Sequence, residues 1–464
     1  MNCYFDFLRV FLLNFLYELK SEKQKRKVIE KRFRKLLKYA KENSDYYKEL
    51  YKDIDIEKVS LQELPSVTKV ELMKHFDEWV TQNDITKKEV DDFTRDNANL
   101  GKKFKNKYAI HQTSGSTGSP ITVLEDSFMH SVSIGSGLIR NWVGGPKTLL
   151  KFYSSVKFAP KATVILPFNI FSIAPCSAKD IVGFFPKRRQ KNTDFIDIST
   201  EIEEIIDRLN KHQPNMIATY PTYIKMLCNY QKVGKLNIKP KMITTIGECL
   251  TNEIRKDVEE CFNGSLLFTV YACTETSSIT HECLLNHKQH LNNDWVIIES
   301  IDKNGNPVPN GVLSDKCYIT NLGNYTQPFI RYELNDRIII RDGKECGCGD
   351  NRPVIEVEGR TPILLEFEND KQEKVYISSI SISIEMHKIG DEIELYQFIV
   401  HNNNKVEIRL RVLEGYDKET IFKKIKSNIG KYLDTYEIND YDIYLSKDNP
   451  QFEKSGKFKE IFQE

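Results

Sequence analysis

The sequence predicts an α/β protein with a large N-terminal domain, built from mixed, mainly parallel sheets and helices, and a small α+β C-terminal domain. The chain has 464 residues, a length typical of two or three domains with large cores. Between about residues 105 and 300, apolar strand-like runs alternate with helical stretches, which indicates βα units around a mainly parallel sheet. The pattern changes near residue 360, so we place the domains at residues 1–359 and 360–464.

The N-terminal segment, residues 1–85, is helical in character. Its first residues are strongly apolar, but charged residues interrupt them and no small-residue cleavage site follows, which argues against a signal peptide. The longest uncharged stretch, residues 10–17, is too short to span a bilayer. Helical spacing places one apolar face at positions 5, 8, 12, 15, 16 and 19. We expect this face to dock on the body of the protein, with a membrane surface or a partner as the alternative.

Local patterns predict the remaining elements in order. Residues 20–52 have the composition of a helical region, and Thr68 stands where an N-cap would begin the next helix. Two apolar runs, residues 107–110 and 121–124, predict strands on either side of a polar loop. Further strands are expected at 147–153, 215–220, 241–247, 266–270, 374–378, 395–400, 405–412 and 442–446, helices at 198–209 and 417–433, and a turn-rich connection at 302–311.

Charge and cysteine content exclude some classes of function. Lys and Arg number 67 against 66 Asp and Glu, so no overall field attracts nucleic acid. Ten cysteines occur without secretory features, which favours a reducing compartment. We therefore expect a cytoplasmic protein with no transmembrane segment and no nucleic-acid partner.

The polar loop at residues 111–120 is the most informative stretch of the chain. Gly115 and Gly118 allow positive φ angles, so successive amides can turn toward one concave face. Hydroxyl donors come from Thr113, Ser114, Ser116 and Thr117. A surface of donors without carboxylates suits a polyphosphate, although a solvated Ser/Gly loop is the ordinary meaning of such a composition. The flanking strands favour a shaped loop, which lacks the Gly-Lys-[Ser/Thr] ending of a Walker loop.

Four further segments carry chemistry behind this loop. Gly247 and Glu248 end a strand-like run, where a glycine lets a ligand approach the backbone. Tyr271, Thr274 and Glu275 follow a buried strand and suit a base, a phosphate oxygen and Mg²⁺. The other two are Asp336, a carboxylate suited to ribose hydroxyls, and Lys457, a cation near the C terminus. Taken singly, each has an ordinary explanation as a capping carboxylate, a turn residue or a surface lysine.

In this order and spacing, the segments resemble the motifs of the adenylate-forming (acyl-CoA synthetase-like) superfamily, over nearly the whole chain. The likeness is to the phenylacetate–CoA ligase branch, including its CapK-like and coenzyme F390 synthetase-like members. ThrSerGlySerThrGlySerPro resembles the phosphate loop of that branch, and TyrAlaCysThrGlu resembles its Tyr-x-x-Thr-Glu motif. ArgTyrGluLeuAsnAsp resembles the Arg-Tyr-x-x-x-Asp motif, GluGlyArg the Gly-Arg before the interdomain hinge, and SerGlyLysPheLys the terminal lysine motif.

The resemblance implies a role for each matching residue. The β- and γ-phosphates of ATP would be held by Thr113, Ser114, Gly115, Ser116, Thr117 and Gly118. Adenine would be surrounded by Gly247, Glu248 and Tyr271, while the ribose would contact Asp336 and the site would extend to Arg360 at the hinge. The catalytic residues would be Thr274 at the α-phosphate, Glu275 as the Mg²⁺ ligand and Lys457 at the transition-state charge.

The implied reaction activates a carboxylic acid with ATP and Mg²⁺. Attack on the α-phosphorus gives an acyl-adenylate and pyrophosphate, and a second nucleophile, expected to be CoA, then displaces AMP. Members of the superfamily rotate the small C-terminal domain between the two steps, so we expect this domain to be mobile. Pro362 fixes φ where that rotation would occur, so the resemblance supports adenylation more strongly than transfer to CoA.

Alternatives to this reaction stay open. Transfer of AMP to a hydroxyl of a larger acceptor is one, and a nucleotide-binding scaffold without turnover is another. A homodimer is an open alternative to a monomer.

Cysteine and histidine residues form a further cluster. Cys346 and Cys348 lie on a glycine-rich turn and are placed to bind one Zn²⁺, with Cys283 and His290 completing a tetrahedron. The rivals for His290 are His281 and His287. The four residues can also be unconnected, because Cys-x-Cys is weaker evidence than Cys-x-x-Cys. Some members of the branch carry such a site, and four protein ligands would make the zinc structural.

Overall fold

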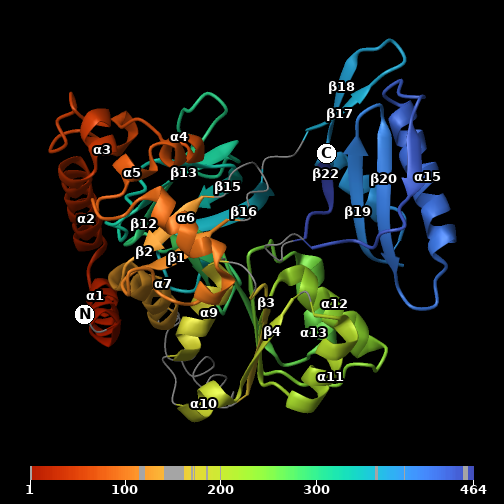
Figure 1. The fold of residues 1–464 in the computed structure, drawn as a ribbon, viewed down its shortest axis with the longest axis horizontal. Helices are drawn as coiled ribbons and strands as arrows, with labels where there is room; N and C mark the ends of the chain where they lie inside the picture. Colours follow the sequence, from red (N-terminus) through yellow and green to blue (C-terminus); the bar gives the residue numbers. More distant parts are fainter. Residues whose placement is uncertain are drawn as a thin grey trace. The chain divides into compact units, whose positions relative to one another are not determined.

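The computed structural model describes residues 3–113, 121–140, 161–168, 171, 173–183, 187–198, 200–360, 364–390, 392–452 and 458–464 (Figure 1). The chain divides into two compact units, Met1–Arg360 and Thr361–Glu464. The first unit combines helices with parallel and antiparallel sheets, and the second combines a four-stranded sheet with helices. These features confirm the predicted fold class, a mixed α/β protein with a smaller α+β part.

Helices form the N-terminal part of the first unit, as the sequence predicts. Their bounds are α1 Cys3–Glu18, α2 Glu22–Asn43, α3 Asp45–Leu50, α4 Lys69–Lys74, α5 Phe76–Trp79 and α6 Lys87–Arg95. Thr68 caps α4, as predicted, because its side chain accepts a hydrogen bond from the amide of Glu71. α2 is amphipathic and buries Phe33, Leu36, Leu37 and Ala40.

A five-stranded parallel sheet forms the centre of the region between residues 161 and 270. Its strand order is β4-β3-β5-β6-β7, with bounds β3 Ala162–Leu166, β4 Thr193–Asp197, β5 Met216–Thr219, β6 Met242–Ile246 and β7 Leu266–Val270. All neighbours are parallel, so each connection crosses over the sheet. The helices of this region are α9 Ile173–Gly183, α10 Lys187–Lys191, α11 Ile202–His212, α12 Pro221–Lys232 and α13 Asn252–Cys261. The predicted parallel sheet is confirmed, whereas the strand expected at 147–153 lies outside the described residues.

Antiparallel sheets complete the first unit. β1 (Ala109–Gln112) and β2 (Thr122–Glu125) pair on either side of the polar loop, as predicted, and α7 (Ser127–Arg140) follows β2. A three-stranded sheet has the order β12-β13-β14, and a four-stranded sheet has the order β10-β11-β16-β15. The bounds are β8 Ala272–Cys273, β9 Ser277–Ser278, β10 Thr280–Glu282, β11 Gln289–Leu291, β12 Val296–Ile301, β13 Lys316–Asn321, β14 Tyr332–Leu334, β15 Asp336–Arg341 and β16 Val354–Arg360.

The second unit has its own hydrophobic core. Its elements are β17 Leu364–Glu368, β18 Lys374–Ser378, α14 Ser379–His387, β19 Ile393–His401, β20 Lys405–Val412, α15 Lys418–Asp434, β21 Asp442–Leu445 and β22 Ile461–Gln463. The four-stranded sheet has the order β21-β20-β19-β22, with only its central pair antiparallel. Apolar residues of α15 pack on this sheet. The strands and the helix predicted for this region are confirmed.

The orientation of α1 differs from the prediction. The helix forms, but most of the face expected to dock on the protein is exposed, namely Phe5, Leu8, Leu12, Leu16 and Leu19. The buried side carries Asp6, Val10, Asn14 and Tyr17. The predicted docking of the apolar face is therefore wrong, because polar partners on the body of the first unit bind the opposite face.

Candidate active site

Three residues predicted for the ATP site lie at the carboxyl ends of two neighbouring strands of the parallel sheet. Gly247 and Glu248 follow β6, and Tyr271 follows β7, the adjacent strand. In open α/β sheets, ligands bind beside the carboxyl ends of the strands. Gly247 has a φ of 85°, which other residues rarely adopt, so a glycine is required where the chain turns at this edge.

Tyr271 and Asp336 are in direct contact although they are far apart in the sequence. The Tyr271 hydroxyl donates a 2.8 Å hydrogen bond to Oδ2 of Asp336. Burial raises the pKa of Tyr271 well above its usual value and the nearby Asp336 carboxylate raises it further, so the phenol stays protonated and donates. Asp336 begins β15 and pairs through its backbone with Arg360, the last residue of β16.

Thr274 and Glu275 lie in the buried turn between β8 and β9. The carbonyl of Glu275 accepts a 3.0 Å hydrogen bond from Nδ2 of Asn321, which fixes the backbone of this turn. The hydroxyl of Tyr332 contacts the Glu275 carboxylate; burial and then this carboxylate raise the pKa of Tyr332. Within the described part of the chain, no basic side chain pairs with Glu275, so this carboxylate is suited to a hard cation.

Glu248 has a structural contact of its own. Its Oε2 accepts hydrogen bonds from the amide and the hydroxyl of Thr222, at 3.0 Å and 2.7 Å. Thr222 belongs to the first turn of α12, where unpaired amides and the helix dipole favour a carboxylate. Glu248 therefore holds the start of α12 against the end of β6, a contact that the sequence analysis missed.

Part of the predicted ATP site lies outside the described residues. This holds for Ser114, Gly115, Ser116, Thr117 and Gly118 of the loop and for Lys457, and only the backbone of Arg360 is described. Thr113 is described and pairs with Ile121 across the ends of the loop. Its amide donates to the Ile121 carbonyl and its Oγ1 accepts from the Ile121 amide, both at 3.1 Å. These two residues fix both ends of the loop.

A buried acid–base cluster beside this loop escaped the sequence analysis. Oε2 of Glu125, at the end of β2, lies 3.3 Å from Nε2 of His111 on β1 and 3.5 Å from Nδ1 of His130 on α7. Its other oxygen, Oε1, accepts a 2.6 Å hydrogen bond from the hydroxyl of Ser277. Because Ser277 follows Glu275 closely in the chain, Glu125 connects the β1–β2 hairpin that carries the polar loop with the Thr274–Glu275 turn.

The charges in this cluster are mutually stabilising. Burial alone would lower the pKa of His111, but interactions with Cys176 and Glu125 outweigh it and raise the pKa to about 10. Burial alone would raise the pKa of Glu125, but His111 and His130 outweigh it and hold this pKa below its usual value. At neutral pH, His111 is therefore an imidazolium paired with a buried carboxylate.

A second set of polar contacts links β2 with the segment after β13. Oε1 of Gln327 accepts a 2.6 Å hydrogen bond from the amide of Leu124, and Nδ2 of Asn324 donates to the Leu124 carbonyl at 3.1 Å. Asn321, at the end of β13, holds the carbonyl of Glu275. Both flanks of the candidate site are thus fixed to the same segment.

Arg331 opens the Arg-Tyr-x-x-x-Asp segment, and its contacts are structural. This buried side chain lies 3.1 Å from Oε2 of Glu299 through Nε. Nη1 donates to the carbonyls of Gln62, at 3.0 Å, and Leu64. The Arg331 carbonyl in turn accepts from the amide of Val67. Arg331 therefore holds the N-terminal segment on the sheet that leads to Asp336.

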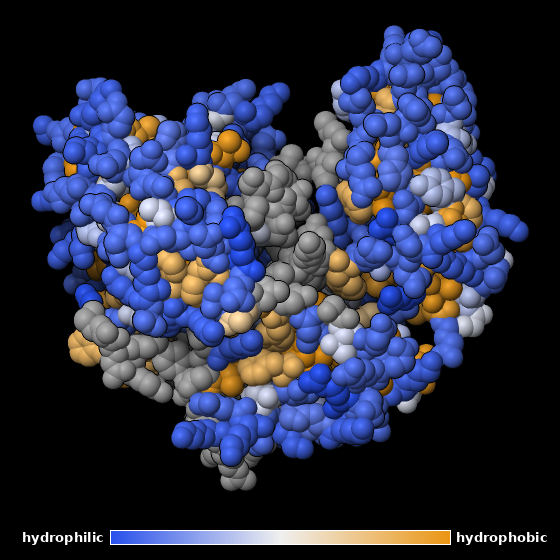
Figure 2. Space-filling view, viewed as in Figure 1, coloured by the Kyte–Doolittle hydropathy of each residue, from blue (hydrophilic) through white to orange (hydrophobic). Residues whose placement is uncertain are grey.

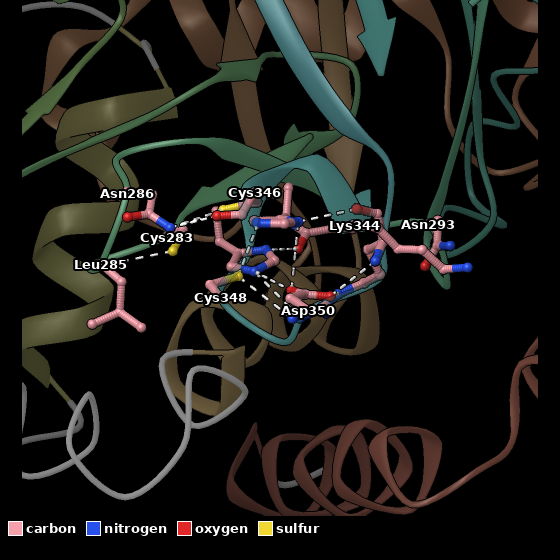
Figure 3. A network of polar contacts seen from close by, with 12 residues as sticks. Cys283, Leu285, Asn286, Asn293, Lys344, Cys346, Cys348 and Asp350 are labelled. Carbon is pink, nitrogen blue, oxygen red and sulfur yellow. Dashed lines mark hydrogen bonds and ion pairs between the residues drawn. The ribbon is translucent and has the colours of Figure 1, made fainter. Parts of the chain in front are cut away.

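The structure brings together the four residues considered for zinc, and Figure 3 labels the three cysteines among them. One ligand atom from each of Cys283, His290, Cys346 and Cys348 lies within 4.8 Å of all the others. Nε2 of His290 is 3.4 Å from Sγ of Cys348. Zn–S and Zn–N bond lengths place the ligand atoms of a tetrahedral site about 3.3–3.8 Å apart, so these residues fit a zinc ion.

The surroundings of these four side chains also suit a metal. The Nδ1–H of His290 donates to the carbonyl of Arg352 at 3.0 Å, which leaves Nε2 facing the sulfurs. Burial alone would raise the pKa of Cys283, but hydrogen bonds from His290 and the amides of Asn286 and Leu285 lower it to about 6. A thiolate, the form that binds zinc, is therefore favoured at this position.

The two rival histidines have other partners. Nε2 of His281 lies 3.3 Å from Oδ2 of Asp350, and Nδ1 of His287 lies 2.7 Å from Oε1 of Glu282. His290, and neither rival, therefore joins the three cysteines.

The fold of this chain is that of the adenylate-forming CoA ligases. The structure is similar to 2-hydroxyisobutyryl-CoA ligase in the postadenylation state in complex with 2-HIB-AMP, with a TM-score of 0.65 and 15% identity over 96% of this chain and 90% of that one. It is also similar to the same ligase with 2-HIB-AMP and CoA in the thioesterification state, with a TM-score of 0.56 and 14% identity over 96% and 91%. The predicted resemblance to the adenylate-forming superfamily is confirmed.

A more particular likeness comes from sequence. The chain is 22% identical over 435 residues to Protein CapK from Staphylococcus aureus, which covers 89% of this chain and 82% of that protein. No protein-family model matches the chain.

Proposed function

We propose that this protein is an AMP-forming ligase of the phenylacetate–CoA ligase-like branch, which activates a carboxylic acid with ATP and transfers the acyl group to CoA. The contact between Tyr271 and Asp336 carries this proposal. It joins the residue proposed for adenine to the residue proposed for ribose, at the sheet edge where α/β folds bind ligands. The fold is shared with a ligase solved with an acyl-adenylate and CoA.

In this proposal the described residues orient ATP. Tyr271 lies against adenine, and its hydroxyl holds Asp336 in position to accept hydrogen bonds from the ribose hydroxyls. The loop that Thr113 begins supplies amide and hydroxyl donors to the phosphates. The contacts of Glu125 with His111 and Ser277 keep the strands on either side of this loop and the Thr274–Glu275 turn in a fixed relation.

The first step joins the acid to AMP. A carboxylate oxygen of the acid bonds to the α-phosphorus, and the bond to the oxygen shared with the β-phosphate breaks, so that pyrophosphate leaves with the electron pair. Thr274 would stabilise the charge that grows on the α-phosphate, and the resemblance assigns the same role to Lys457. Glu275 would hold Mg²⁺, which would supply positive charge beside the polyphosphate. In the second step the thiol of CoA attacks the acyl carbon, loses its proton to water, and releases AMP.

Pyrophosphate release from the purified protein with ATP, Mg²⁺ and a panel of carboxylic acids tests this function. We expect release only with an acceptable acid, a product with the mass of the acyl-adenylate, and conversion to acyl-CoA and AMP when CoA is added. A product that carries AMP on a hydroxyl acceptor would contradict ligation. ATP binding without pyrophosphate release under any acid would indicate a scaffold.

We also propose that the four-residue cluster holds a structural Zn²⁺. It would connect the β10–β11 hairpin, which carries Cys283 and His290, to the turn before β16, which carries Cys346 and Cys348. β16 runs from this turn to the backbone pair of Arg360 with Asp336. The zinc would therefore fix the start of β16, and the other end of this strand pairs with Asp336, the residue proposed to contact the ribose.

The proposed compartment is the cytoplasm. Nine cysteines of the described residues are free thiols, as expected in a reducing environment. The balanced total charge supports the absence of a nucleic-acid partner.

A further inference from the structure

The N-terminal helix α1 is attached to the protein through its polar side. Asp6 accepts a hydrogen bond from the hydroxyl of Ser127 on α7, and Oδ1 of Asn14 accepts one from the indole of Trp295 at 2.7 Å. One turn further on, the Tyr17 hydroxyl donates to Oδ1 of Asn293 at 3.0 Å. At the end of the helix, Oε1 of Glu18 lies 3.0 Å from Nη1 of the buried Arg352.

The opposite side of α1 is apolar and faces water. The exposed fractions are 63% for Phe5, 64% for Leu8, 41% for Phe11, 55% for Leu12, 43% for Leu16 and 69% for Leu19, just beyond the helix. Among the described residues, fourteen large hydrophobic side chains are exposed, and six belong to this short segment. Scattered exposed apolar residues are normal, but a contiguous stripe marks a surface that binds something.

The polar contacts specify this orientation. Turning α1 about its axis to bury the leucines would break the bonds of Asp6, Asn14 and Tyr17 and leave their polar atoms without these partners. It would also separate Glu18 from Arg352, which would keep its pair with Asp350 but lose one of its two carboxylate partners. The apolar face is therefore held outward. Seen from the side drawn in Figure 2, most of the surface is hydrophilic.

The positive charge next to the apolar face of α1 indicates which kind of partner this face binds. α1 and α2 follow one another along the same edge of the first unit (Figure 1). Residues 3–43 carry twelve Lys and Arg against five Asp and Glu, whereas the whole chain carries 67 against 66. The exposed basic side chains are Arg9, Lys23, Arg26, Lys27, Lys31, Lys35 and Lys38. An apolar stripe next to excess positive charge matches an anionic lipid surface.

We propose that α1 binds the surface of an anionic phospholipid membrane, with its outer apolar side chains inserted between the head groups. The helix has 16 residues, about 24 Å at 1.5 Å per residue, so it lies on the bilayer. No helix among the described residues is long and apolar enough to cross a membrane. The basic residues of α2 contact the anionic head groups next to it. This proposal does not depend on the reaction that the protein catalyses.

Co-sedimentation of the full-length protein with vesicles tests the proposal. The vesicles contain phosphatidylcholine alone or phosphatidylcholine with phosphatidylglycerol. We expect binding to the mixed vesicles that weakens with salt and that is much weaker without phosphatidylglycerol. The variant Leu8→Ser/Leu12→Ser/Leu16→Ser should bind at least about tenfold more weakly, because three large apolar side chains no longer enter the interface.

A matched control separates this surface from exposed apolar residues in general. Val70→Ser/Val233→Ser/Val312→Ser removes three side chains that are equally exposed but lie apart in the sequence, and it should bind like the wild type. Circular dichroism and thermal unfolding of both variants verify that they are folded. A charge variant, Lys27→Gln/Lys31→Gln/Lys35→Gln, should lose the preference for phosphatidylglycerol.

Three results would overturn the proposal. One is no sedimentation of the wild type with either vesicle, and another is undiminished binding by the folded triple leucine variant. The third is a wild-type dimer in solution that does not bind vesicles and becomes a monomer in the leucine variant, since α1 would then bind a second copy of the chain.

Discussion

The substitution Glu125→Gln tests the buried contacts that join the β1–β2 hairpin, which carries the polar loop, to the Thr274–Glu275 turn. The pKa of His111 rises from 6.5 to about 10 in the folded protein, a change that corresponds to about 5 kcal/mol in favour of its charged form. Removing one partner of a buried ion pair generally costs about 3–5 kcal/mol. We therefore expect Glu125→Gln to lower the free energy of unfolding by about 3–5 kcal/mol near neutral pH.

The pH dependence of this loss has a definite sign. The folded-state pKa of His111 is raised, so its stabilisation is complete below its unfolded pKa of about 6.5 and falls as the pH rises toward 10. Within this window the folded chain holds one proton more than the unfolded chain, and stability falls by about 1.4 kcal/mol per pH unit. The pKa of Glu125 is lowered, so its contribution is present above about pH 4.3 and stays constant here. In Glu125→Gln, His111 loses the carboxylate that stabilises its charge and keeps only the interaction with Cys176, so this fall becomes smaller.

Urea unfolding followed by tryptophan fluorescence measures the difference. All three tryptophans, Trp79, Trp142 and Trp295, belong to the first unit, so the signal reports on that unit alone. The wild type should exceed the variant most near pH 6.5 and progressively less toward about pH 9. Glu333→Gln is the control, because its partly exposed pair with Lys316 should be worth at most about 1 kcal/mol. A difference that is the same at every pH would refute a charged His111.

Three further substitutions test other parts of the structure. Tyr271→Phe removes the hydrogen bond to Asp336 and should raise the KM for ATP about 3–10-fold with little change in kcat; an equal loss in both would argue against a positioning role. Cys346→Ser should abolish bound zinc in metal analysis, while Cys228→Ser, a buried cysteine outside the cluster, should keep it; full zinc content in both would exclude Cys346 as a ligand. Arg331→Ala should lower the free energy of unfolding by about 3–5 kcal/mol in the same urea assay, because Glu299 is left buried and unpaired; a loss below about 1 kcal/mol would contradict this.

Elements with strong local signals were predictable from the sequence. The alternating strand at 405–412 and the cap at Thr68 are examples, since each depends on residues only a few positions apart. The parallel direction of the strands in the central sheet was also predictable, because the alternation of strands and helices allows few other connections.

The candidate site was only partly predictable, because motif spacing does not show which side chains touch. The motifs named Tyr271 and Asp336, but the bond between them depends on how the antiparallel sheets pack beside β7. Glu125 and His111 lie on paired strands, yet their contact with His130 and Ser277 needs α7 and the β8–β9 turn to pack against them. The apolar run predicted a strand at 121–124, which ends one residue before Glu125.

The orientation of α1 shows a limit of helical periodicity. The spacing of Leu8, Leu12 and Leu16 correctly places them on one face, but the same spacing fits a face turned inward or outward. The choice depends on partners that lie far away in the sequence, above all Trp295 and Arg352. Burying the leucines would remove apolar area from water, yet it would break the buried hydrogen bonds of Asp6, Asn14 and Tyr17 and the pair of Glu18 with Arg352. An apolar face kept in water by buried polar bonds is therefore evidence of a binding surface, and it can be recognised only when both faces of the helix are compared.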